Sequence, residues 1–159
     1  MTPWWRGQRG EWYAALQLAL VLMVVFGPAT LAGLPKWPGA TTLRRTAGTA
    51  LMVCGALVGI AALKRLRGSV SATGSLKSAG ALVTTGPYRF VRHPVYCGLI
   101  LLTLGWSLAV GGWLTSVYAI ALAVLLDKKS AREERRLTER FAAYRDYQLR
   151  TYKLMPFIY

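Results

Sequence analysis

The chain has 159 residues, of which 54% are hydrophobic and 16% are charged, and its formal net charge is +14. This length favours one domain, and the apolar content excludes an intrinsically disordered chain. A large basic excess often indicates a nucleic-acid partner, but the mean hydropathy of +0.35 indicates instead a membrane protein whose cations lie in its loops.

The first apolar segment covers residues 12–34 and is interrupted by Gly27-Pro28. It is long enough to cross a bilayer, which takes about 20 apolar residues, and Pro28 predicts a kink. No clear small-residue cleavage site follows, so we expect a retained span and not a signal peptide. A second uncharged segment, residues 47–63, is rich in glycine and alanine, and small residues favour close helix packing in lipid.

The third apolar segment, residues 94–126, contains no charged residue and has Gly111-Gly112 near its middle. It could form one long helix or a tight hairpin of two short ones. A hairpin places 17 of the 20 Lys and Arg residues on one side of the membrane, whereas a single helix divides them 8 against 12. The positive-inside rule favours the hairpin. We therefore expect four spanning helices and cytosolic N- and C-termini.

Residues 64–92 are rich in glycine, serine and threonine and predict a loop. Residues 128–150 predict a helix that continues the fourth span, with Leu137, Phe141 and Tyr144 on one face. Such a basic amphipathic helix commonly lies on a membrane surface, but it could equally pack against the 64–92 loop. The expected fold is therefore all-α: a polytopic membrane helical bundle of about four transmembrane helices and a C-terminal amphipathic cytosolic helix.

The densest group of polar residues lies just before the third span. Gly86-Pro87 predicts a turn. Arg92 and His93, the only histidine of the chain, then precede Pro94, a residue that suits the first turn of a helix. Free N–H groups at a helix start attract anions, and a histidine exchanges protons near neutral pH. Alternatively, Arg92 and His93 merely lie at the level of the lipid headgroups.

Two of the six acidic residues, Glu133 and Glu134, follow the fourth span on the side that carries Arg92 and His93. They could form surface ion pairs with neighbouring arginines, each worth about 0–1 kcal/mol. Alternatively, one of them faces the bundle and binds a cationic or hydroxyl-bearing ligand, and the sequence leaves open which one. The two cysteines lie in apolar segments, so neither a disulfide framework nor a metal site is expected.

Residues 82–98 resemble the signature of the isoprenylcysteine carboxyl methyltransferase superfamily, which includes phospholipid N-methyltransferases. They contain L-x-T-x-G-x-Y and then R-H-P-x-Y-x-G. The resemblance continues through Glu133-Glu134 to the terminal Pro156-Phe157-Ile158 and covers about half of the chain. It implies an integral membrane methyltransferase that uses S-adenosylmethionine, releases S-adenosylhomocysteine and has no Rossmann domain.

The resemblance also implies the site residues, with the cofactor between residues 82–98 and the C-terminal helix. The residues implied to bind the cofactor are Leu82, Val83, Gly86, Tyr88, Arg92, His93, Pro94, Tyr96, Gly98, Glu133 and Glu134. Those implied to be catalytic are Glu134, Glu133, His93 and Arg92. Gly98 would give the cofactor room, and residues 1–66 and 67–159 would be the spanning and the cofactor-binding halves of one domain.

We therefore expect methyl transfer from S-adenosylmethionine to a lipophilic or amphiphilic small molecule at the membrane–cytosol boundary. A carboxylate and aromatic faces would suit the cationic sulfonium. The alternative is a non-enzymatic membrane protein whose basic tail binds anionic lipid or a partner. In that case the histidine and the two glutamates would be dispensable.

Overall fold

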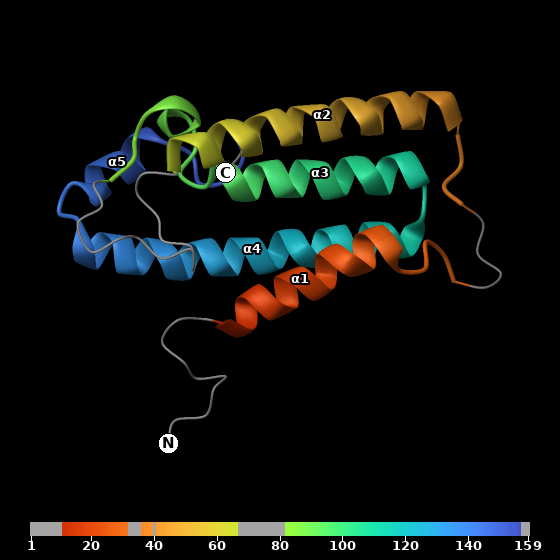
Figure 1. Ribbon diagram of the computed structural model, residues 1–159, viewed down its shortest axis with the longest axis horizontal. Helices are drawn as coiled ribbons and strands as arrows, with labels where there is room; N and C mark the ends of the chain where they lie inside the picture. Colours follow the sequence, from red (N-terminus) through yellow and green to blue (C-terminus); the bar gives the residue numbers. More distant parts are fainter. Residues whose placement is uncertain (1–10, 32–35, 40, 67–81, 157–159) are drawn as a thin grey trace, which may run out of the picture. The chain divides into compact units, whose positions relative to one another are not determined.

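The computed structural model describes residues 11–31, 36–39, 41–66 and 82–156, and these ranges contain helices and no strand. The α-helices in chain order are α1 (Glu11–Phe26), α2 (Thr41–Leu66), α3 (Pro94–Val110), α4 (Trp113–Arg140) and α5 (Tyr144–Arg150), with the short 3-10 helix η2 (Gly86–Arg89) before α3 (Figure 1). The all-α prediction is confirmed for the described part of the chain.

Helix α1 ends at Phe26, so the kink predicted at Pro28 within a longer helix is wrong. The N–H of Gly27 closes the last turn on the carbonyl of Met23 at 3.0 Å. Pro28 follows directly, and a proline disfavours helical backbone at the residue before it and offers no N–H for a further turn. The end of the predicted segment, residues 32–34, lies outside the described residues.

Helix α2 is long and apolar enough to cross a membrane, judged by length and composition. It begins before the predicted segment 47–63 and extends past it at both ends. Helices α1 and α3 are apolar but shorter. The number of spans and the cytosolic placement of both termini therefore stay predictions.

The hairpin predicted at Gly111-Gly112 is confirmed, because α3 ends at Val110 and α4 begins at Trp113. Gly111 has a φ angle of +68°, in the left-handed region that glycine adopts without steric cost. Beside the turn, the hydroxyls of Ser107 and Ser116 form a hydrogen bond of 2.6 Å. Only Gly111 and Gly112 thus connect the two helices.

The chain forms two compact units, residues 1–53 with 100–129 and residues 54–99 with 130–159, and α2, α3 and α4 contribute a segment to each. In unit 1, a Cβ atom on Gly48 of α2 would lie 2.5 Å from the carbonyl oxygen of Gly105 of α3. In unit 2, a Cβ atom on Gly98 of α3 would lie 2.6 Å from the carbonyl oxygen of Gly55 of α2. Glycines therefore permit the close approach of α2 and α3 in both units, as the sequence predicted.

The tail does not form the single helix predicted over residues 128–150. Helix α4 ends at Arg140. A turn follows, in which the N–H of Tyr144 donates a hydrogen bond of 3.0 Å to the carbonyl of Phe141. The break buries Tyr144, which is 1% exposed. It also directs α5 back onto the segment before α3, where the Tyr147 hydroxyl donates to the carbonyl of Tyr88 at 2.6 Å.

This packing is one of the two arrangements that the sequence left open for the tail. The predicted loop 64–92 also holds more structure than expected, because residues 64–66 belong to α2 and η2 forms a helical turn. Residues 67–81 of that loop lie outside the described part of the chain.

Candidate active site

Unit 2 brings the residues before α3 next to the glutamate pair of α4. The buried His93 ring has Nε2 3.3 Å from Oε1 of Glu134 and Nδ1 3.7 Å from Oε2 of Glu133. Beside it, Arg92 Nε donates to Glu134 Oε1 at 2.6 Å, and the hydroxyl of Tyr96 donates to Glu133 Oε1 at 2.5 Å. Five of the residues implied by the family resemblance thus form one contiguous group.

The end of the chain fixes the backbone of this group. The segment around Tyr152 runs parallel to residues 90–93, with an isolated bridge between Val91 and Tyr152. Three backbone hydrogen bonds join the segments: Arg92 N to Tyr152 O at 2.8 Å, His93 N to Lys153 O at 3.1 Å and Tyr152 N to Phe90 O at 3.0 Å. Residues far apart in the sequence therefore hold the start of α3 against the tail.

The guanidinium of Arg92 forms hydrogen bonds with other residues of the protein. Besides the bond to Glu134, its Nη1 donates to the backbone carbonyls of Gln148, at 3.1 Å, and of Thr151. The guanidinium therefore joins α4 to the residues of α5 and the turn after it. In this arrangement Arg92 stabilises Glu134 and the tail.

Glu134 is the more strongly held of the two carboxylates. Its side chain is 12% exposed, and its Oε2 accepts a hydrogen bond of 3.2 Å from Nε2 of Gln148. Burial raises the pKa of the Glu134 carboxyl, but the neighbouring His93 and Arg92 lower it by a larger amount. The net pKa is therefore about 2, below the usual 4.5. Glu134 is therefore ionised at neutral pH, and Arg92 compensates its charge.

Glu133 is the more available carboxylate. Its side chain is 40% exposed, and among the residues that the structure describes no Lys or Arg lies within ion-pair distance of it. Burial and, after it, the charge of Glu133 raise the pKa of Tyr88 to about 12, so the Tyr88 phenol stays protonated. The Tyr96 ring stacks on the imidazole of His93 with centroids 5.5 Å apart.

His93 carries a buried polar atom without a hydrogen bond among the described residues, namely Nε2. The 3.3 Å separation from Glu134 lacks hydrogen-bond geometry, although it is short enough for an electrostatic contact. Leaving a buried polar group unpaired costs about 1–3 kcal/mol. A bound ligand could supply the hydrogen-bond partner that this nitrogen lacks.

The remaining predicted residues occupy several places in unit 2. A pocket of about 540 Å³ separates the segment before η2 from α5, and its lining comprises Leu82, Thr84, Arg89, Ala143, Asp146, Tyr147, Arg150 and Thr151. This is where the family resemblance placed the cofactor, and a volume of roughly 300–1,000 Å³ is usual for small-molecule sites. Val83 is partly exposed beside Leu82, and Tyr88 is buried.

Three of the predicted residues have a role in the fold itself. Gly86 forms the predicted turn with a φ angle of +66°. Pro94 is buried as the first residue of α3. Gly98 faces Gly55 and Gly59 of α2, so its missing side chain permits the close approach of this helix, whereas its role toward the cofactor stays a prediction.

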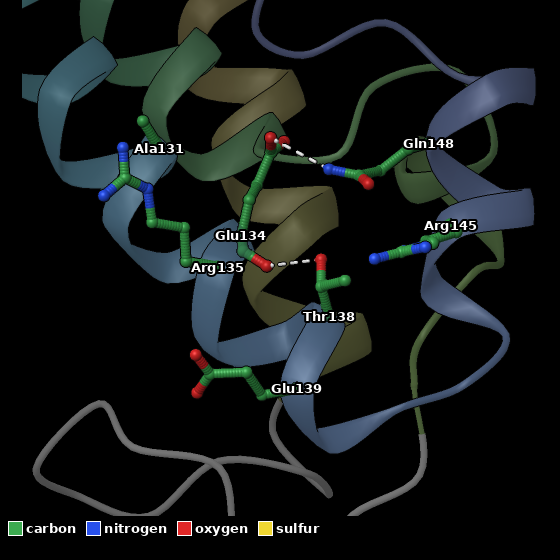
Figure 2. A pocket seen from close by; sticks show the side chains of 7 residues that line it. All are labelled: Ala131, Glu134, Arg135, Thr138, Glu139, Arg145 and Gln148. Carbon is green, nitrogen blue, oxygen red and sulfur yellow. Dashed lines mark hydrogen bonds between the residues drawn. The ribbon is translucent and has the colours of Figure 1, made fainter.

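A second pocket, of about 560 Å³, lies between α4 and α5, and its lining comprises Ala131, Glu134, Arg135, Thr138, Glu139, Arg145 and Gln148 (Figure 2). Only Glu134 in this set was predicted. Figure 2 shows Gln148 reaching from α5 to the Glu134 carboxylate, while the hydroxyl of Thr138 donates to the Glu134 carbonyl at 2.8 Å. No motif marks Gln148 in the sequence, because its contact depends on the turn between α4 and α5.

Comparison with known proteins identifies a family. The family model described as phospholipid methyltransferase matches residues 43–144, more than half of the chain. The solved structure of the eukaryotic intramembrane Ras methyltransferase ICMT (isoprenylcysteine carboxyl methyltransferase) has the same fold, with a TM-score of 0.63 over 96% of this chain and 54% of that one, at 18% identity.

Two curated relatives match about half of the chain. The Delta(14)-sterol reductase TM7SF2 of Mus musculus is 32% identical over 82 residues, 49% of this chain and 20% of that protein. The cobalt-zinc-cadmium resistance protein CzcN of Cupriavidus metallidurans is 40% identical over 80 residues, 47% of this chain and 35% of that protein. The matches therefore span about a fifth and about a third of these relatives.

Proposed function

The chain belongs to the phospholipid methyltransferase family, and we propose that it transfers a methyl group from S-adenosylmethionine to a lipophilic or amphiphilic acceptor at the membrane–cytosol boundary. One observation carries this proposal. The buried imidazole of His93 lies within 3.7 Å of the carboxylates of both Glu133 and Glu134, although about 40 residues separate them in the sequence.

The residues of the group fit the charge of the methyl donor. S-adenosylmethionine, when bound, supplies a methyl group on a sulfonium cation. Glu133 offers a half-exposed carboxylate without an arginine partner among the described residues, and a carboxylate attracts a cation more strongly as water is excluded. Tyr96 adds an aromatic face, and aromatic faces attract cations. We assign Glu133 to the sulfonium.

The other carboxylate has a different role in this proposal. Glu134 is held by Arg92 and Gln148, so it fixes one side of the His93 ring. The His93 ring lies between the two carboxylates, with Nε2 toward Glu134 and Nδ1 toward Glu133. Methyl transfer depends mainly on positioning and on exclusion of water, and the packed tail contributes to both.

The acceptor class follows from the surroundings of the site. Helix α2 can cross a bilayer, and the family resembled by residues 82–98 acts on lipid-like molecules. We therefore propose that the acceptor enters from the bilayer, while the methyl donor enters from the cytosol, on the side where most of the cations are expected.

The test is isothermal titration of S-adenosylmethionine and S-adenosylhomocysteine into the full chain, purified in detergent. The expected result is binding of both compounds, with both weakened in His93→Ala and only S-adenosylmethionine weakened in Glu133→Gln. Glu139→Gln is a matched control, because Glu139 is an exposed glutamate on the same helix. No binding of either compound by the wild-type protein at millimolar concentration would refute the proposal and favour a non-enzymatic lipid-binding or partner-binding role.

A further inference from the structure

Gln148 closes a ring of contacts between the three segments that form the site. Its side-chain Nε2 donates to Glu134 Oε2 at 3.2 Å, while its backbone carbonyl accepts from Arg92 Nη1 at 3.1 Å. Arg92 Nε in turn donates to Glu134 Oε1 at 2.6 Å. Figure 2 shows the Gln148 amide directed from α5 toward the carboxylate.

These contacts fix the orientation of the Glu134 carboxylate. With Oε2 held by Gln148, the other oxygen, Oε1, is turned toward Arg92 and lies 3.3 Å from His93 Nε2. Without a donor on Oε2, the carboxylate could rotate about its last bond, since such sp³–sp² torsions are broad. Among the described residues of the site, Gln148 bonds to Glu134 and Arg92 and not to the imidazole, so its side chain acts on His93 through Glu134.

We propose that Gln148 is a positioning residue, which holds Glu134 so that one oxygen faces Arg92 and His93 and thereby keeps the site in a ligand-binding form. The role requires a neutral hydrogen-bond donor. A carboxylate in its place would repel Glu134 and compete for Arg92, and two adjacent carboxylates raise the pKa of one of them. Once protonated, however, an introduced carboxyl group can donate a hydrogen bond to Glu134, as the amide does.

A positioning role of Gln148 predicts a pH dependence that a purely structural role would not produce. Gln148→Ala removes the donor at every pH and should weaken S-adenosylhomocysteine binding about threefold to tenfold, the range for one hydrogen bond. Gln148→Glu should weaken binding at pH 8 about tenfold more than Gln148→Ala, because it adds repulsion between like charges. At pH 5 its affinity should return to within about threefold of the wild type at the same pH, because the acid donates again.

The matched control is Leu149→Glu. Leu149 is the next residue of α5 and is 86% exposed, so this variant adds the same charge to the same helix without contacting Glu134. Its affinity should follow the wild type at both pH values. Equal affinities of Gln148→Glu and Gln148→Ala at each pH, or the same pH dependence in Leu149→Glu, would overturn the positioning role.

The binding readout rests on the proposed function, so a ligand-free measurement separates the two. The thermal unfolding midpoint of each variant is recorded in detergent at pH 8 and pH 5 without ligand. Gln148→Glu should unfold at a lower temperature than Leu149→Glu at pH 8 but at a similar temperature at pH 5. If the wild type binds no S-adenosylhomocysteine but the two variants still differ in unfolding temperature at pH 8, the proposed function fails and the contact of Gln148 with Glu134 stands. If the two variants unfold at the same temperature, the positioning role fails, whether or not the ligand binds.

Discussion

Replacement of Glu133 by glutamine should separate the two forms of the methyl donor. S-adenosylmethionine carries a positive sulfonium, whereas S-adenosylhomocysteine has nearly the same shape and a neutral sulfur. Glu133→Gln removes one negative charge and keeps the size of the side chain. If Glu133 faces the sulfonium, the variant should lose affinity for the first compound and retain it for the second.

The size of the effect follows from the exposure of the carboxylate. Two unit charges about 4 Å apart attract each other by about 1 kcal/mol in water and by about 4 kcal/mol near a protein surface. The Glu133 side chain is 40% exposed, which places its attraction for a bound cation in the lower part of that range, at about 1–2 kcal/mol. The affinity for S-adenosylmethionine should therefore fall about 5-fold to 30-fold, and that for S-adenosylhomocysteine by less than about twofold.

The assay is isothermal titration of both compounds into the wild type, Glu133→Gln and the control Glu139→Gln at pH 7.5. The decisive quantity is the ratio of the two affinities, because a general disturbance of the site lowers both equally. An unchanged ratio in Glu133→Gln, or an equal change in Glu139→Gln, would refute the assignment of Glu133 to the sulfonium.

Three further results are expected. The pKa of Glu134 is lowered from 4.5 to about 2, so its contribution to stability is present above about pH 4.5 and is lost as the pH falls toward 2; chemical denaturation from pH 6 to pH 3 should therefore cost the wild type about 2–3 kcal/mol more than Glu134→Gln, and parallel curves would contradict this. His93→Ala should weaken the binding of S-adenosylmethionine and of S-adenosylhomocysteine, because the imidazole lies against both carboxylates of the site; unchanged affinities in isothermal titration would contradict this. Gly98→Ala should lower the unfolding temperature by the equivalent of about 1–3 kcal/mol, because its Cβ meets the backbone of α2, whereas Gly59→Ala, with nothing within 4 Å, should not; weaker ligand binding at unchanged stability would instead place Gly98 at the cofactor.

The sequence predicted those features that depend on local chemistry or on the membrane. The hairpin at Gly111-Gly112 follows from two glycines in an uncharged segment and from the distribution of cations. The same distribution placed His93 and the pair Glu133-Glu134 at one end of the helices, where the structure brings them together. Neither prediction needed knowledge of how particular side chains pack.

The break between α4 and α5 could not be predicted in this way. Residues 141–143 contain no glycine or proline, and two of them are alanine, the best helix former. The helix ends there because the turn buries Tyr144, at 1% exposure, and burial of a large aromatic side chain outweighs the helix propensity of a few residues. Gln148 was missed for the same reason, since its contact with Glu134 exists only because of this turn.

The glutamate pair shows what the sequence motif alone leaves undecided. Consecutive residues of an α-helix project about 100° apart, so Glu133 and Glu134 contact different partners besides the His93 ring that both approach. The structure directs Glu134 toward Arg92 and Gln148 and Glu133 toward Tyr96, with 40% of the side chain exposed. One carboxylate is therefore used to hold the site together, and the other keeps charge that a ligand can use. A helix rotation that exchanged the two roles would also break the contact between α4 and α5, so the packing of the tail determines which glutamate is held by Arg92 and Gln148.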